Sequence, residues 1–590
     1  MSMNSRASGR ILALVIVAVA VALAFGTVLG NDASDRVFPL PVNEEDKTYL
    51  PADEAEKQYN AAIDSMLEEL ISASDVDDMA TAIYDGYEAL VDTINQFVWM
   101  NLDYSIHPAE YAEEYQKWSL INDTALNTYR SALREVLISD TTGRMEKALD
   151  SVGIDPADIR DEEPLTPEEK ALLDRQTQLV TGYDDIMSRE YSRTVNGTTV
   201  TSSNYSSVGN LTAQQRAEAY YGLLYDRWYD AAEVYAQLVD VRNEYATIQG
   251  YSDYAEYSYG NIYSRDYGPD DAWTFTECTG EVYERYAELG DMISSDPTLS
   301  YSNLNWLRSL DHDGALNILR AHESNVGGDL PDLVDYMKRY DLFYICENSD
   351  SLNSAYTIQI FNQNSALIFL GAPYTGIPLV TTLVHEFGHA SYICLNSNSQ
   401  TCLDVMEIQS QGNEALFYAA CGGYLMRGSD SMAADGISDL MYTVWTAGLW
   451  TQFELWAYEK QAETGETLTV QMLSDGFDAI LEKNGMTDTF QFPPGLRGLA
   501  WVQVPHLFQS PLYYVSYATS ALNALEIYEI AVDDFDKARD LYLDVVYLKD
   551  IDGYIDTVER TGLTNALGKD AATDIVDKAL EALKRQVAST

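Results

Sequence analysis

The chain has 590 residues, of which 46% are hydrophobic, so it can bury a large core and exceeds the size of a small binding module. It contains 36 Lys and Arg against 93 Asp and Glu, a formal net charge of −57, which repels phosphate backbones and argues against nucleic acid as a partner. Such acidity is typical of a soluble or salt-tolerant surface or of selection for cationic substrates, and charge alone does not name a substrate.

The first thirty residues are typical of a targeting segment. Residues 11–30 contain no charged side chain and follow Arg6 and Arg10. A basic flank stays in the cytoplasm, so we expect the rest of the chain to be extracytoplasmic, touching a membrane only through this segment. Twenty helical residues reach about 30 Å and can anchor in a bilayer, whereas Ala22-Leu23-Ala24 resembles a signal-peptide cleavage site. Residues 1–30 are therefore predicted to be either a membrane anchor or a signal peptide.

The next segments are predicted to be a tether and a helical region. Residues 31–50 are polar with two prolines, which favours a tether. Residues 51–200 form the predicted N-terminal region, with helical apolar spacing to about residue 190, interrupted at Pro108, Pro156, Pro164 and Pro167. Residues 194–210 contain Asn-Gly and many Ser and Thr, which indicates a hairpin or surface loop.

The pattern changes between residues 355 and 372. AYTIQIF and SALIFLGA are short, rich in β-branched and aromatic residues, and separated by Asn362-Gln363-Asn364. This arrangement predicts a small β-hairpin in an otherwise helical protein. The following segment, 379–394, has helical spacing again.

A metal-binding motif lies in this last segment. Residues 384–389 are Val-His-Glu-Phe-Gly-His. On a helix, the spacing of four puts His385 and His389 on one face, where they can share one metal ion, with Glu386 beside them to accept a proton from water. Zinc suits nitrogen and oxygen ligands with one position left open, so we predict one Zn²⁺ per chain. The preceding hairpin supports a zinc peptidase site, because an edge strand beside the metal helix can align a substrate backbone.

A catalytic zinc usually needs a third protein ligand. Leu395 stands where an extended motif would place a third His, so the ligand must come from farther along the chain. The candidates are Asp404, Glu407 and Glu414. Glu407 and Glu414 are two helical turns apart on one face, so one can bind zinc while the other orients a histidine ligand. They could also lie on a solvated helix face, but the neighbouring residues are apolar enough to be buried.

HEFGHASYICL followed by MEIQSQGNEALF resembles the thimet oligopeptidase and oligoendopeptidase F family of zinc peptidases. The resemblance implies that Glu407 is the third ligand. Segments 242–257, 450–458 and 501–525 extend the similarity over about residues 210–560. The chain departs from the family at Tyr392, where another His is frequent, and its loop before Glu407 is shorter. Both departures concern substrate specificity and leave the ligands intact.

The segment 501–525 is expected to supply the second half of the site. The resemblance assigns His506 to substrate binding, and Tyr514 and Tyr517, three apart on a predicted helix, to transition-state stabilisation, with Tyr513 as a possible substitute. Because the chain has 43 Tyr, these aromatic side chains could instead belong to the core.

The expected fold is mainly α, a zincin-type metallopeptidase with a small β-sheet beside the active-site helix. The resemblance further implies a deep substrate channel between helical lobes, with residues 201–590 as the catalytic region. The expected function is a zinc-dependent endopeptidase that hydrolyses internal bonds of short oligopeptides. The alternatives are a carboxypeptidase of similar fold, for which Arg427 or Arg497 could bind the terminal carboxylate, and a catalytically inactive, membrane-tethered peptide-binding protein.

Cys394 and Cys402 flank the loop after the metal motif and could form a disulfide in an exported protein, or remain buried free thiols. The sequence predicts neither the oligomeric state nor the cleavage preference.

Overall fold

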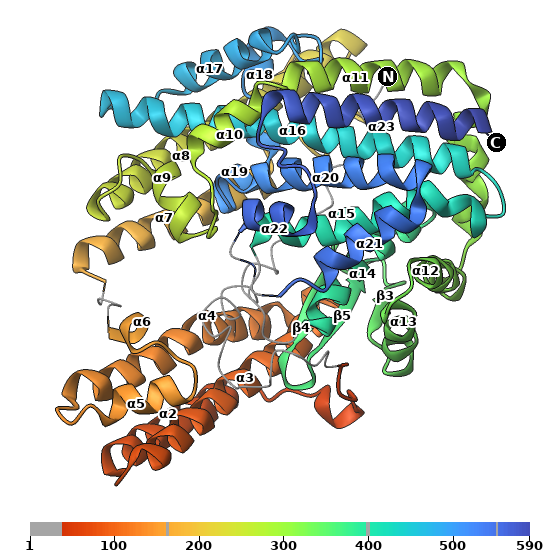
Figure 1. Ribbon diagram of the computed structural model, residues 1–590. Helices are drawn as coiled ribbons and strands as arrows, with labels where there is room; N and C mark the ends of the chain where they lie inside the picture. The colour runs from red at the N-terminus through yellow and green to blue at the C-terminus, as the bar shows by residue number, and fades with distance from the viewer. Residues whose placement is uncertain are drawn as a thin grey trace.

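The computed structural model describes residues 38–160, 165–209, 211–396, 402–549, 551 and 553–589. It is mainly α-helical with two small β-sheets (Figure 1), which confirms the predicted fold class. The predicted targeting segment, residues 1–30, and residues 31–37 of the predicted tether lie outside these ranges, whereas residues 38–50 lie within them. Within them, no helix combines the length and the apolar character that crossing a bilayer requires.

The N-terminal helices pack around apolar cores of their own (Figure 1). They are α2 (Ala52–Ser72), α3 (Val76–Ile106), α4 (Pro108–Ser139), α5 (Arg144–Ser151) and α6 (Pro156–Arg160). Pro108 and Pro156 each occupy the first position of a helix, where the missing N–H would have no intrahelical partner anyway. These two predicted interruptions therefore mark helix starts, and Pro164 lies outside the described residues.

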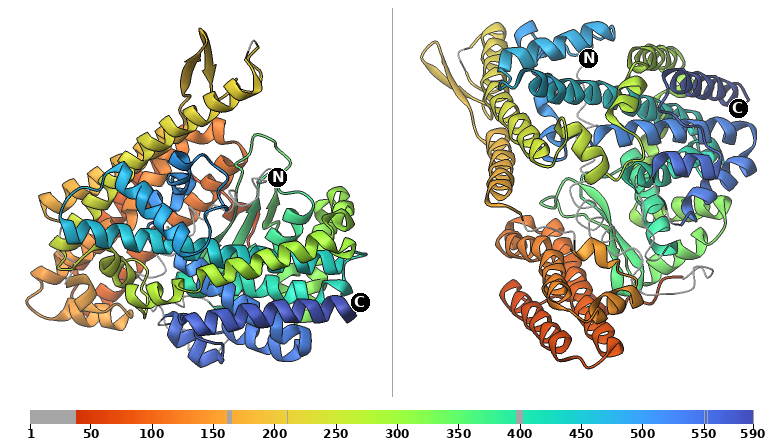
Figure 2. Two further views of the ribbon diagram at one scale, coloured as in Figure 1. Left: turned by 90° about the horizontal axis from the view of Figure 1, so that it is seen from above. Right: turned by 60° about the vertical axis from the view of Figure 1, so that its left-hand side comes forward.

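Two long helices carry a projecting hairpin. α7 (Pro167–Ser188) is followed by β1 (Ser192–Val195), β2 (Thr198–Thr201) and α8 (Ala213–Ile248). The strands are antiparallel and joined by Asn196 and Gly197, both with positive φ, as a tight hairpin turn requires. Figure 2 shows this hairpin standing out from the body beside the start of α8, which confirms a hairpin in this segment.

The second sheet consists of β3 (Phe343–Ile345), β4 (Ala355–Ile360) and β5 (Ser365–Leu370), in the order β3-β5-β4. The predicted hairpin is β4 with β5, paired antiparallel from Ala355 and Leu370 to Ile360 and Ser365. The sequence did not indicate β3, which has only three residues and pairs parallel with β5. Every residue of β5 is buried, and β4 is an edge strand of this sheet.

The remaining helices form the larger part of the molecule. They are α9 (Tyr254–Asn261), α10 (Pro269–Thr276), α11 (Thr279–Ser295), α12 (His312–Val326), α13 (Leu330–Arg339), α14 (Ile377–Leu395), α15 (Leu403–Ala420), α16 (Ser429–Thr464), α17 (Val470–Lys483), α18 (Pro494–Arg497), α19 (Pro505–Gln509), α20 (Tyr514–Asp533), α21 (Phe535–Val546), α22 (Tyr554–Thr561) and α23 (Lys569–Ser589). Short 3₁₀ turns connect some of them. In Figure 1, α16, α20, α15 and α14 follow one another toward β4 and β5, and each helix packs on the next.

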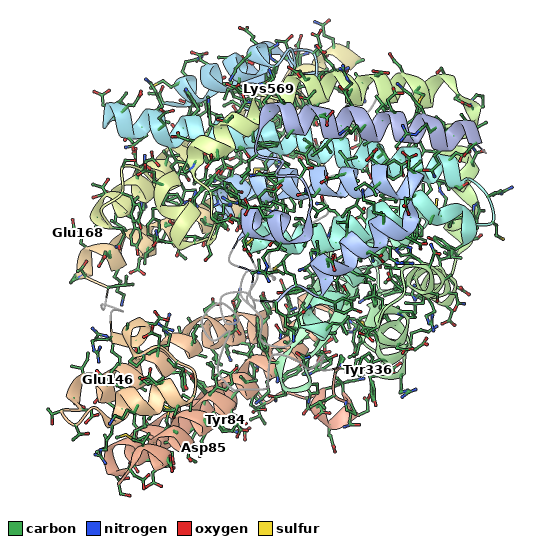
Figure 3. The ribbon with its side chains drawn as sticks, viewed as in Figure 1. Tyr84, Asp85, Glu146, Glu168, Tyr336 and Lys569 are labelled. Atoms are coloured by element: carbon green, nitrogen blue, oxygen red, sulfur yellow. The ribbon has the colours of Figure 1, made fainter. Side chains whose placement is uncertain are left out.

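This stack surrounds α15 with protein. All residues from Leu403 to Tyr418 are buried, including the carboxylates of α15. By contrast, acidic side chains such as Asp85, Glu146 and Glu168, labelled in Figure 3, lie exposed on the outer helices. Because a buried carboxylate is unfavourable without a partner, each acidic residue of α15 needs a cation, a hydrogen-bond donor or a metal ion.

All five cysteines are thiols, none of them in a disulfide. Cys394 and Cys402 are both buried, and they do not form the disulfide considered above. Burial raises the pKa of the Cys394 thiol to about 12, so it stays protonated at neutral pH.

Candidate metal centre

The helix α14 carries the His-Glu-x-x-His motif into the interior. It begins after Gly376, whose φ of +66° favours glycine, and Pro378 lies in its first turn. From Leu379 to Tyr392 every residue is buried. The imidazoles of His385 and His389 lie side by side, with ring centroids 5.1 Å apart.

Gly388 allows α15 to approach this helix closely. A Cβ atom at this position would lie 2.5 Å from the Gln409 carbonyl oxygen and 2.6 Å from Ser410 Cα. Any other residue would push the two helices apart. The glycine between the two histidines therefore decides whether Glu407, on the facing turn of α15, can reach them.

Three ligand atoms converge where these helices meet. Oε2 of Glu407 lies 3.7 Å from Nε2 of His385 and 3.9 Å from Nε2 of His389, and the three residues together form a potential metal site. Ligands bound at about 2.0–2.2 Å to a tetrahedral zinc stand roughly 3.3–3.6 Å apart, so small side-chain shifts suffice. In addition, Nε2 of His389 is buried without a hydrogen-bond partner. A bound cation would remove this unfavourable state, so the donor set fits zinc.

Glu414 orients the first histidine. Its Oε1 accepts a hydrogen bond from Nδ1 of His385 at 2.5 Å, and its Oε2 accepts one from the hydroxyl of Tyr418 at 2.7 Å. When the single proton of a neutral imidazole is on Nδ1, the lone pair of Nε2 is available to bind a metal ion on the side of Glu407. Glu407 and Glu414 thus lie on different sides of the His385 ring, one in the potential metal site and one at Nδ1, where a carboxylate can orient a histidine ligand.

The charges around the two histidines differ. Burial lowers the pKa of His385, but its hydrogen bond to Glu414 and the charges of Glu414, Glu407 and Glu386 together raise it above its ordinary value. Burial lowers the pKa of His389 well below its ordinary value. His389 is therefore neutral at physiological pH, as a metal ligand must be.

The third candidate carboxylate has another role. Asp404 Oδ2 lies 3.3 Å from Nε of Arg265, and its Oδ1 accepts a hydrogen bond from the Tyr267 hydroxyl at 3.1 Å. Its charge is thus compensated away from the histidines. Among Asp404, Glu407 and Glu414, only Glu407 belongs to the donor set.

Glu386 faces the sheet. The Thr357 hydroxyl of β4 lies 2.8 Å from Glu386 Oε2 and 2.8 Å from the Glu386 carbonyl oxygen, so it can donate to either. Thr357 restricts the carboxylate of the predicted general base. Sequence reasoning missed this residue, because one threonine in a strand carries no signal and the contact spans 29 positions.

The predicted second half of the site is a cluster of aromatic rings. His506 lies on α19, and its ring centroid is 5.2 Å from Tyr514, 6.0 Å from Tyr517 and 6.0 Å from Tyr513. Tyr514 and Tyr517 are half-buried on the first turn of α20, whereas Tyr513 is buried, with its hydroxyl 3.5 Å from Glu407 Oε1. The structure thus brings all four residues together and places the hydroxyl of Tyr513, the predicted substitute, beside the metal-ligand set.

His506 is uncharged in this environment. Burial lowers its pKa to about 4. At neutral pH the imidazole can therefore exchange hydrogen bonds with a peptide backbone but does not attract a carboxylate by charge.

Comparison with solved structures shows the fold. The chain is similar to PZ peptidase A in complex with an inhibitor, with 16% identity, a TM-score of 0.66, and coverage of 90% of this chain and 97% of that one. It is similar to a Bacillus anthracis protein described as an oligoendopeptidase F, with 17% identity, a TM-score of 0.63, and coverage of 93% of this chain and 99% of that one. It is also similar to oligoendopeptidase-F from Enterococcus faecium, with 16% identity, a TM-score of 0.57, and coverage of 92% of this chain and 100% of that one. No protein-family model and no curated protein sequence matches the chain. The resemblance seen in the sequence is therefore confirmed as a shared fold.

Proposed function

We propose that this protein is a zinc-dependent endopeptidase that cleaves short peptides. The observation that carries the proposal is the convergence of His385, His389 and Glu407 on one point, with Glu386 in the adjacent position of the same helix. The fold shared with solved oligoendopeptidases supports it. The expected substrate channel would limit substrates to short, unfolded peptides.

Each residue of the site has a role in this reaction. Zinc, when bound, supplies a Lewis acid that polarises the scissile carbonyl and makes water acidic. Glu386 accepts a proton from the attacking water and can return it to the departing amine, while Thr357 restrains its carboxylate. The edge strand β4 offers backbone groups to which a substrate can add as a further strand.

The aromatic cluster supplies hydrogen-bond donors for the oxyanion. His506 is expected to hold the substrate backbone, and the hydroxyls of Tyr514 and Tyr517 to stabilise the charge that develops on the carbonyl oxygen. Burial raises the pKa of Tyr514, so its hydroxyl keeps its proton and can donate it in a hydrogen bond at physiological pH.

Replacing Tyr514 or Tyr517 by Phe is expected to lower kcat by about 10²- to 10³-fold, the size typical of losing one oxyanion donor. KM should change little, because the interaction strengthens only in the transition state. The measurement is steady-state hydrolysis of a fluorogenic peptide, with metal content checked for each variant.

Tyr528→Phe is the matched control for those two variants. Tyr528 lies on the same helix, and its hydroxyl bonds Gln586 on α23. Its removal should leave kcat unchanged. Wild-type rates for both Tyr514→Phe and Tyr517→Phe would transfer the donor role to Tyr513, whose Phe variant completes the series.

The structure gives less support to the two alternatives. Arg497 is bound to Asp478 at 2.8 Å, and Arg427 is exposed, with its carbonyl accepting from Trp306. Arg497 is thus already paired, which disfavours it as the carboxylate anchor of a carboxypeptidase. An inactive peptide-binding protein would not need Glu386 beside the metal ligands.

Chelation is the direct test of the proposed function. The purified region from residue 38 onward, incubated with a mixed peptide library, should cut internal bonds and stop when a chelator is added. Adding Zn²⁺ should restore cleavage, and mass spectrometry locates the cuts. Removal of single C-terminal residues would instead support the carboxypeptidase, and rapid cleavage of a folded protein would contradict a closed channel.

The place of action is part of the proposal. We infer from the uncharged residues 11–30 behind Arg6 and Arg10 that the enzyme works outside the cytoplasm. The peptides it meets there would come from extracellular proteins. Fractionation of cells that express the full chain, with immunodetection, tests this location.

A further inference from the structure

A buried arginine joins the two halves of the candidate site. The side chain of Arg265, in the loop between α9 and α10, has no exposed surface. Its three guanidinium nitrogens reach three different groups: Nε lies 3.3 Å from Asp404 Oδ2, Nη1 3.0 Å from the Leu512 carbonyl, and Nη2 2.8 Å from Ser516 Oγ. One planar cation is thus bound to α15 and to the turn that leads into α20.

Both ends of this connection lie next to site residues. Asp404 is one helical turn before Glu407 on α15. Leu512 and Ser516 bracket Tyr513, whose hydroxyl lies 3.5 Å from Glu407 Oε1. Arg265 therefore sets the distance between the Leu512–Tyr517 turn and α15, although it belongs to neither segment.

The turn itself is strained and held from two sides. Leu512 has a φ of +65°, which a branched side chain rarely adopts. Its N–H donates to Glu454 Oε1 at 2.8 Å, and its carbonyl accepts from Arg265. Such a conformation persists only when surrounding contacts impose it, and it is frequent at functional sites.

The surroundings also fix the guanidinium. The rings of Tyr259, Tyr263 and Tyr267 lie 4.4, 4.5 and 5.6 Å from its central carbon. Rings at these distances favour a planar cation, and the rigid fork serves several acceptors at once. A lysine could keep the charge beside Asp404 but could not reach all three groups from one nitrogen.

We propose that Arg265 is a positioning residue for peptide hydrolysis, holding the Leu512–Tyr517 turn at the distance from Glu407 that the oxyanion donors require. This proposal rests on the proposed function. Arg265 does not touch the substrate. It acts through the backbone of Leu512 and the hydroxyl of Ser516.

Arg265→Lys tests the proposal. We expect kcat to fall about 10- to 100-fold, because moving a catalytic group by about 1 Å can lower the rate by this much. KM should change less than about threefold. A phosphinic peptide, which mimics the tetrahedral transition state, should bind more weakly by the same factor as kcat falls, and the affinity for a cleaved peptide product should not change. Metal content and the thermal unfolding midpoint are measured alongside.

Ser516→Ala is the second variant, should the lysine variant fail to fold. It removes one of the three contacts with little change in volume, and it should lower kcat about 3- to 10-fold with the same selective loss of phosphinic-peptide affinity. Thr519→Val is its matched control, since Thr519 is also buried on α20 but its hydroxyl bonds the carbonyls of Val515 and Ser516 in its own helix. Its kcat should be that of the wild type.

The outcomes separate the two proposals. A wild-type protein without chelator-sensitive peptidase activity would refute the proposed function, and the role of Arg265 would fall with it. With an active wild type, a folded, metal-loaded Arg265→Lys that keeps kcat within about twofold overturns the positioning role. The positioning role is also overturned if Arg265→Lys loses affinity for the phosphinic peptide and for the product by the same factor. If Arg265→Lys does not fold, a Ser516→Ala variant with the kcat of the wild type overturns it.

Discussion

Glu386→Gln is expected to keep its metal and to lose peptidase activity by about 10²- to 10⁴-fold, because an amide cannot accept the proton of the attacking water. The substitution preserves the size of the side chain and its contact with Thr357, so the site should keep its shape. The decrease should appear in kcat, measured on a fluorogenic peptide, with metal content determined on the same sample. Appreciable activity in this variant would remove Glu386 from the mechanism.

Glu323→Gln is the control for exchanging a buried carboxyl for an amide. Glu323 lies on α12, accepts a hydrogen bond from Asn413, and has its pKa raised to about 8 by burial. It is therefore mostly protonated at neutral pH, and glutamine resembles that state. Full activity of this control would assign the loss in Glu386→Gln to that position alone.

Glu407→Ala is expected to lose its metal and with it all peptidase activity. Only two histidines would remain to hold the ion, and a catalytic zinc normally has three protein ligands. Elemental analysis after dialysis against a weak chelator gives the metal content per chain.

Glu414→Ala is the matched comparison, because this second buried glutamate of α15 contacts His385 at Nδ1, on the other side of the ring from Glu407. Losing a partner of this kind typically weakens metal affinity or activity by about 10- to 100-fold, so the ion should be retained when zinc is in excess. Loss of zinc from Glu414→Ala but not from Glu407→Ala would exchange the two assigned roles.

Several features were predictable from the sequence because they depend on local patterns. The spacing of His385 and His389 places them on one helical face, and Asn196-Gly197 forms a hairpin turn because both residues tolerate positive φ. The pair β4 and β5 followed from β-branched composition. Likewise, the spacing of seven positions from Glu407 to Glu414 gave two carboxylates on one side of α15.

Other features had no local signal. β3 is only three residues long and pairs with a strand more than twenty positions away. Thr357 reaches Glu386 only because the sheet packs on α14. From the sequence, Tyr513 was only a substitute for Tyr514 and Tyr517, and its contact with Glu407 depends on the left-handed turn at Leu512.

The sequence by itself determined the helical character of the chain, the motif that offers two imidazoles and a general base, and a short set of carboxylates for the third ligand. It could do so because helix periodicity relates residues three to seven positions apart. The tertiary structure decided which carboxylate faces which nitrogen. Gly388 lets α15 approach α14 so that Glu407 meets the histidines, and Arg265 pairs with Asp404. Such choices depend on contacts between helices and loops, from Gly388 with Gln409, 21 positions apart in the chain, to Arg265 with Asp404, 139 positions apart, and no local pattern contains them.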